Sequence, residues 1–169
     1  MRTVVSGIRR ERTARLALSW AYIASMAVAL AGLFVPFVQQ GCPANGLCLL
    51  LKLYLPHTAL AQGQDGPILL ALVVASLALG LLAVPRPSML LLGARLIVSL
   101  ATLAVACLDT FDLTRVVHLS NPYGFLVLAP GFVVVIIGAA LGSFLALVLL
   151  AFTMLRHRSR RSSTRIVAA

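Results

Sequence analysis

The chain has 169 residues, of which 61% are hydrophobic and only 11% are charged. Soluble globular domains are about half apolar with roughly a quarter of their residues charged, so this composition excludes an ordinary water-soluble fold. A disordered chain is also excluded, because such chains are poor in large apolar residues. The formal net charge is +10. In a soluble domain that charge would indicate nucleic-acid binding, so its distribution along the chain decides what it means.

Four apolar runs follow one another along the chain, over residues 16–38, 67–84, 88–108 and 129–155. Each is close to the roughly 20 residues that a helix needs to cross a hydrocarbon core about 30 Å thick. Backbone polar groups find no water in lipid, so runs that are apolar on every side are expected to be helical. The sequence predicts an all-α fold, an antiparallel bundle of four transmembrane helices that forms a single membrane domain over residues 1–169.

The basic residues gather on one side of this predicted bundle. Twelve of the fourteen, opposed by a single acid, lie in the ends 1–15 and 156–169 and in the segment 85–95. The other two share the predicted outer loops, 39–66 and 109–128, with three acids. Basic residues concentrate on the cytoplasmic side of membranes, so both termini are predicted to be cytoplasmic, in a bacterial inner membrane. Nucleic acid is not an expected partner, because the basic residues are split between short ends without interleaved aromatic residues.

Small residues recur at a spacing of four in three of the runs. This spacing places them on one helix face, where small side chains let two helix backbones approach closely. We interpret these faces as packing surfaces within the bundle or as docking surfaces for a second copy or a larger membrane partner. The residues are Ala17, Ala21, Ser25, Ala29, Ser76, Gly80, Gly138, Gly142 and Ala146.

Two cysteines, Cys42 and Cys48, lie close together in the first outer loop with turn-forming residues between them. Turn formers make closure easy and the outer side of a membrane permits oxidation, so a disulfide that pins this loop is predicted. Four spans, internal termini and this pair resemble the DsbB family of quinone-linked disulfide oxidoreductases. The resemblance implies that the two cysteines could instead form a catalytic pair, which is the alternative to a structural disulfide. That family has a tight Cys-x-x-Cys and a second outer pair, whereas five residues intervene here and Cys107, expected to be a small buried hydrophobe, stands alone.

Ionisable residues mark both ends of the third run. Arg95 lies about 10 Å inside it at 1.5 Å per residue, and a charge within the membrane suggests a functional site. Its long side chain is expected to reach lipid phosphate on the basic side or to meet Glu11. Four more ionisable residues, interpreted as an interfacial polar cap, follow at a spacing of three near the outer end: Asp109, Asp112, Arg115 and His118.

Three short stretches carry a family resemblance. Residues 31–37 read Ala-Gly-Leu-Phe-Val-Pro-Phe, residues 65–67 read Asp-Gly-Pro, and residues 129–132 read Ala-Pro-Gly-Phe. The layout is similar to that of small, uncharacterised four-span membrane proteins of bacteria, in which a proline-aromatic closes the first helix and a glycine-aromatic opens the last. The claudin-type four-span proteins share this outline, but their Trp-Gly-Leu-Trp signature is missing because Trp20 is the single tryptophan. The resemblance implies a four-span fold and carries no activity with it.

The sequence predicts a non-enzymatic integral membrane protein, an accessory, assembly or structural subunit packed against a larger bacterial membrane complex. The basis is the set of small-residue faces and elaborated outer loops, in a sequence without a recognisable catalytic motif. A small oligomeric transporter or channel is the first alternative, and a quinone-linked thiol–disulfide oxidoreductase is the second. No metal or cofactor is predicted, and a bound lipid or quinone is compatible with the sequence. Expected partners are membrane lipids and either other membrane subunits or a second copy of the chain.

Overall fold

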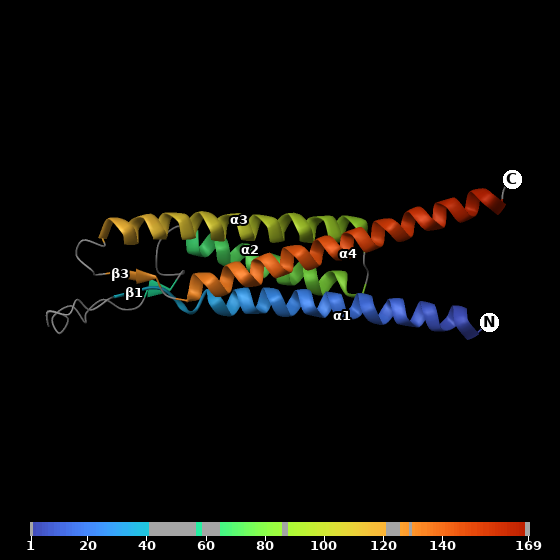
Figure 1. Ribbon diagram of the computed structural model, residues 1–169, viewed down its shortest axis with the longest axis horizontal. Coiled ribbons are helices and arrows are strands. Elements are labelled where there is room, and N and C mark those ends of the chain that lie inside the picture. The colour runs from blue at the N-terminus through green and yellow to red at the C-terminus, as the bar shows by residue number, and fades with distance from the viewer. Residues whose placement is uncertain are drawn as a thin grey trace.

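The computed structural model describes residues 2–40, 57–58, 65–85, 88–120, 126–128 and 130–167. Within these ranges the chain forms four helices, α1 (Arg2–Gly32), α2 (Asp65–Ala83), α3 (Met89–Ser120) and α4 (Gly131–Val167). They run lengthwise as one bundle, and the two ends of the chain lie at the same end of it (Figure 1). Each helix contains a stretch that is long and apolar enough to cross a membrane.

The membrane-crossing stretches follow the apolar runs of the sequence, with different ends. They cover Thr13–Gly32, Gly66–Ala83, Met89–Arg115 and Gly131–Arg156. The first helix ends at Gly32, before the end of its apolar run, and the backbone turns before it enters a strand at Pro36. Proline lacks a backbone N–H and disfavours helix in the residue before it, which accounts for the early end.

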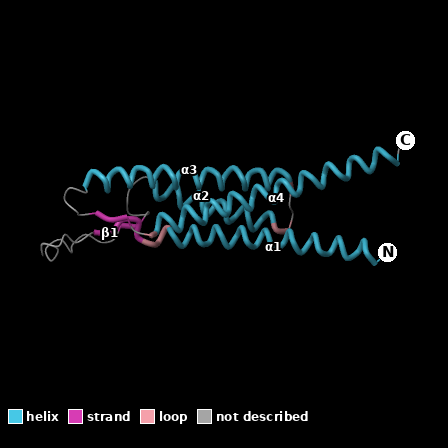
Figure 2. The backbone as a smooth tube through the Cα atoms, viewed as in Figure 1, coloured by secondary structure: helices cyan, strands magenta, loops and turns pink. Residues whose placement is uncertain are grey.

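A small antiparallel sheet covers the end of the bundle opposite the termini (Figure 2). Its strands are β1 (Pro36–Gln40), β2 (His57–Thr58) and β3 (Leu126–Leu128), in the order β2-β1-β3. In the β1–β3 pair, Val38 lies opposite Leu128 and Gln40 opposite Leu126. The sheet therefore ties the segment that leaves α1 to the segment that enters α4, a connection that the sequence analysis did not predict.

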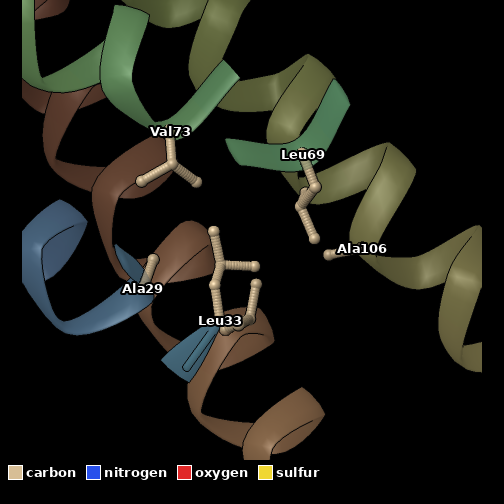
Figure 3. Close-up of a cluster of buried hydrophobic side chains, with 6 residues drawn as sticks. Ala29, Leu33, Leu69, Val73 and Ala106 are labelled. Atoms are coloured by element: carbon tan, nitrogen blue, oxygen red, sulfur yellow. The ribbon is translucent and has the colours of Figure 1, made fainter. Parts of the chain in front are cut away.

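Buried positions repeat every three and four residues along each helix, the spacing at which neighbouring helices interlock at a shallow crossing angle. On α3 this buried stripe consists of Leu92, Arg95, Ser99, Thr102 and Ala106. Toward the sheet, the core is an apolar cluster to which every helix contributes: Ala29, Leu33, Leu69, Val73, Ala106 and Val135. In Figure 3, the side chains of Leu33, Leu69 and Val73 point toward one another between the helices.

The backbones of α1 and α4 approach each other closely at Gly138. A Cβ placed there would lie 2.7 Å from the backbone nitrogen of Ala29 and 2.8 Å from the carbonyl oxygen of Ser25. One turn further on, a Cβ at Gly142 would collide with the terminal methyl group of Met26. Lipid tails are as apolar as the side chains, so helices in a membrane associate through close packing of this kind. Glycine is therefore required at Gly138, where the neighbouring atoms belong to the backbone, whereas a side chain at Gly142 would displace the flexible end of Met26.

Candidate functional site

A polar cluster lies inside the bundle, on the side of the apolar cluster toward the chain ends. We call it the Arg95 cluster: Tyr22 of α1, Ser76 of α2, and Arg95 and Ser99 of α3. All four residues are fully buried, with 0% of their surface exposed. Three helices therefore bring a charged group and three hydroxyl groups together within the membrane-crossing part of the bundle.

The ring of Tyr22 supports the guanidinium group of Arg95. The central carbon of the guanidinium lies 3.3 Å from the ring centroid, well within the distance of about 6 Å that defines a cation–π contact. An edge of the same ring packs on Gly80, where an added Cβ would lie only 3.0 Å from Cε1 and 3.2 Å from Cδ1. The absence of a side chain at Gly80 therefore makes room for the ring beneath the arginine.

The hydroxyl group of Tyr22 fixes the ring between α2 and α3. Its single proton is directed at two acceptors, Oγ of Ser99 at 2.8 Å and the carbonyl oxygen of Ser76 at 3.3 Å. The hydroxyl of Ser99 also donates to the carbonyl oxygen of Arg95 at 2.7 Å. These bonds leave the ring little freedom to rotate or slide, so its face is held in position for the guanidinium.

Four polar atoms of the cluster have no hydrogen-bond partner. They are Nε, Nη1 and Nη2 of Arg95 and Oγ of Ser76, all of them buried. A buried polar group without a partner costs free energy, and an unpaired charge within a membrane costs at least several kcal/mol on most estimates. The cluster therefore combines a rigidly held cation with unused hydrogen-bond donors.

The acidic residues of this sequence are far from the cluster along their helices. There are four of them: Glu11, Asp65, Asp109 and Asp112. At 1.5 Å per residue, Glu11 lies about 16 Å from Tyr22 along α1, and Asp65 about 16 Å from Ser76 along α2. Asp109 lies about 21 Å from Arg95 along α3, and Asp112 further still. Among the described residues, none of these four acids is close to the Arg95 cluster along its helix.

The expected outward extension of the Arg95 side chain, toward lipid phosphate at the basic end or toward Glu11, is wrong. Its side chain is fully buried, with the guanidinium on Tyr22. The reason is its helix face, because Arg95 shares the buried stripe of α3 with Leu92 and Ser99 and so points into the bundle. Those neighbours at spacings of three and four were the available signal, whereas the distance from the helix end, taken alone, suggested an outward side chain.

Seven of the nine small residues that the sequence singled out lie inside the bundle: Ser25, Ala29, Ser76, Gly80, Gly138, Gly142 and Ala146. The other two, Ala17 and Ala21, are exposed on α1. A strict spacing of four drifts around a helix of 3.6 residues per turn. The stripe on α1 therefore begins on the outer surface and enters the interface with α4 only at Ser25.

The end of α3 nearer the sheet carries the predicted polar cap. Asp112 and Arg115 are exposed, while Asp109 is half-buried and interacts with other groups of the protein. The side chain of His118 lies outside the described residues, as do Cys42 and Cys48. No group of three or more potential metal ligands occurs within the part of the chain that the structure describes.

Cys107 is exposed on α3, so the expectation of a small buried side chain is wrong. It follows the buried Ala106 directly and shares the outer face of the helix with Leu100 and Phe111. A cysteine on a lipid-facing surface needs no partner, since its thiol is only a weak hydrogen-bond donor.

One polar contact near the chain ends was not anticipated. Nη2 of Arg15 donates to Oγ1 of Thr153 at 3.0 Å, which joins α1 to α4. Tyr22 and Ser99 were also not predicted to belong to a functional site. A single tyrosine within an apolar run, and a hydroxyl one turn after an arginine, are signals that would have found them.

In comparisons with protein-family models, with curated proteins and with solved structures, nothing matches the chain. The fold itself defines the class. Four helices, each long and apolar enough to cross a membrane, make the chain a multi-pass membrane protein built as a four-helix bundle. A polar cluster centred on a buried arginine lies within it.

Proposed function

We propose that the protein is a non-enzymatic accessory or assembly subunit that docks against a larger bacterial membrane complex through one face of α1. The observation that carries the proposal is an exposed surface made mostly of alanine, which we call the alanine face. It follows α1 at spacings of three and four and consists of Ala14, Ala17, Ala21, Ala24, Val28 and Ala31, all of them exposed.

The exposed surface of α4 differs from the alanine face. On α4 the exposed residues include Ile137, Leu141, Phe144 and Leu147, which are bulky and suited to contact with lipid tails. Small residues on a membrane helix let another backbone approach closely, and the packing so gained drives association in lipid. A transmembrane helix of a partner subunit therefore fits the alanine face better than lipid does.

Trp20 supports this interpretation. It lies beside the alanine face with 57% of its surface exposed, and it is the single tryptophan of the chain. Tryptophan is enriched among the residues that contribute most to binding at protein interfaces. A large aromatic side chain next to a flat, small-residue surface gives a partner helix both an anchor and room to approach.

We also propose that the end of the bundle that carries both termini is cytoplasmic, in a bacterial inner membrane. Helices α1 and α4 extend beyond the other helices at that end (Figure 1). Their extensions contain most of the basic residues of the chain, from Arg2 to Arg12 and from Arg156 to Arg165. Basic residues favour the cytoplasmic side and are attracted to anionic headgroups there.

Substitution of the alanine face tests the docking proposal. The double variant Ala21→Leu with Ala24→Leu adds bulk to the face, so it should reduce co-purification of the partner at least tenfold in mild detergent. The matched control is Ala71→Leu with Ala78→Leu, which adds the same bulk to exposed positions of α2 and should leave co-purification unchanged. Recovery of the wild-type chain only as a monomer, or only with further copies of itself, would contradict the proposal.

A small oligomeric transporter or channel is a second candidate, and the buried charge of Arg95 favours it. Ionisable residues inside membrane bundles often mark the path of an ion or substrate. Purified protein in liposomes should then carry labelled inorganic phosphate across the bilayer, with the flux lost in Arg95→Gln. Empty liposomes provide the baseline, and a flux equal to that baseline would rule out phosphate transport.

A further inference from the structure

We infer that the Arg95 cluster is a binding site for a phosphate group, held between α1, α2 and α3. The inference concerns the interior of the bundle and does not depend on the alanine face or on a docked partner. Three features of the cluster carry it: the arrangement of its donors, its uncompensated charge and its depth in the membrane.

The donors match the acceptors of a phosphate group. The guanidinium lies over the ring of Tyr22, and its donors Nε, Nη1 and Nη2, which are enclosed within the bundle, have no hydrogen-bond partner. Arginine donates two parallel hydrogen bonds to phosphate through one edge of its guanidinium. A phosphate group offers three strong acceptor oxygens, and the hydroxyl of Ser76 is a further buried donor of the cluster that has no partner.

The charge of the cluster requires an anion. Arg95 is fully buried, and the acidic residues of the sequence lie about 16 Å or more away along their helices. The ring of Tyr22 offsets part of the charge through its quadrupole, a contact of about 2 kcal/mol when it is shielded from water. This is less than the cost of an isolated cation in a membrane, so a bound anion supplies the stabilisation that the chain itself lacks.

The depth of the cluster indicates where the phosphate group comes from. Arg95 lies six residues after Met89, the first residue of α3, which corresponds to about 9 Å along the helix. The cluster therefore lies within two turns of the end of α3 that adjoins the α2–α3 connection. At that end a phosphate group is available from a phospholipid headgroup or from the ion in solution, and the two sources share the chemistry that the donors recognise.

Native mass spectrometry of the delipidated full chain tests the site. The probes are inorganic phosphate, short-chain phosphatidylglycerol, and acetate as a carboxylate of the same charge type. The wild-type chain should bind one phosphate group, and Arg95→Gln should weaken binding about tenfold or more, since a hydrogen bond to a charged group contributes about 1.5–3 kcal/mol. Ser76→Ala, which retains the charge, should weaken binding by a smaller factor.

Arg15→Gln is the matched control, because it removes one positive charge from α1 at a position bonded to Thr153 rather than to the cluster. It should leave the affinity for phosphate unchanged. Circular dichroism of each variant establishes that the helices are intact. Arg95→Gln should fold at least as stably as the wild-type chain without phosphate, because it removes an unpaired buried charge.

The outcomes separate the sources of phosphate. Binding of phosphatidylglycerol alone assigns a lipid headgroup, and binding of inorganic phosphate assigns the free ion. The inference is overturned if neither probe binds, if Arg95→Gln binds as tightly as the wild-type chain, or if acetate binds as tightly as phosphate. Because each readout uses the isolated chain, failure of the docking proposal leaves these results unaffected.

Discussion

At the scale of single residues, Tyr22 is the centre of the molecule's polar interior. Its ring faces the guanidinium of Arg95 at 3.3 Å, and its hydroxyl bonds to groups of α2 and α3. The ring offsets part of the positive charge of Arg95, and the hydroxyl fixes the position of the ring. These two contributions can be separated by substitution, because phenylalanine keeps the first and removes the second.

Replacement of Tyr22 should therefore lower the free energy of unfolding in two steps. Tyr22→Phe loses the hydrogen bonds and should cost about 0.5–1.5 kcal/mol. Tyr22→Leu also removes the aromatic face beneath Arg95 and should cost about 1–2 kcal/mol more. Unfolding of the detergent-solubilised chain by sodium dodecyl sulfate, followed by circular dichroism, measures both. Equal stabilities of the two variants would show that the ring does not stabilise the arginine.

The depth of Arg95 was evident from the sequence, while its orientation was inferred wrongly. Counting residues from the end of an apolar run gives a distance along the helix and says nothing about the helix face. The face was recoverable from the buried stripe, in which Arg95 lies between Leu92 and Ser99. Contact with Tyr22 was not recoverable, because nothing in the sequence aligns a residue of α1 with a residue of α3 more than seventy positions later.

At the scale of elements, the contact between α1 and α4 depends on the lack of side chains on α4. At Gly138 the neighbouring atoms belong to the backbone of α1 and cannot move aside as a flexible side chain would. Gly93 on α3 differs, since nothing lies within 4 Å of an added Cβ there. Both glycines lie in membrane-crossing helices, and they differ in the space around them. Substitution of Gly93 therefore serves as the control for substitution of Gly138.

Alanine at these two positions should have opposite effects on stability. Gly138→Ala forces the helices apart and should destabilise the fold by about 1–3 kcal/mol, the usual cost of overpacking. Gly93→Ala should stabilise it by about 0.5–1 kcal/mol, because glycine is unfavourable within a helix. Thermal unfolding in detergent compares the two, and destabilisation by Gly93→Ala would show that the space around it is smaller than the structure indicates.

The four helices could be predicted because hydropathy and length suffice to recognise a membrane-crossing helix. The sheet could not be predicted. Strand β1 (Pro36–Gln40) overlaps the end of the first apolar run and has no alternation of apolar and polar residues. Its pairing with β3 joins segments nearly ninety residues apart. Only the bundle, which places the end of α1 beside the start of α4, brings the two strands together.

At the scale of the whole molecule, the helices define two unlike ends. One carries the sheet, and the other carries both termini and the basic extensions of α1 and α4 (Figures 1 and 2). The net charge of +10 is therefore concentrated at one end of the bundle and indicates orientation in a membrane. That the four helices cross a membrane, with the basic end in the cytoplasm, is the central claim on which both proposals depend.

Labelling of single cysteines in intact bacterial cells tests this claim most directly. In a chain without its three native cysteines, Ser6→Cys, Ser88→Cys and Ser162→Cys report on the basic end, and Gln62→Cys reports on the predicted outer loop 39–66. A membrane-impermeant thiol reagent should label only position 62 in intact cells and should label the other three after permeabilisation. Labelling of position 6, 88 or 162 in intact cells would contradict the proposed orientation. Labelling of only one terminus would contradict the even number of membrane crossings as well.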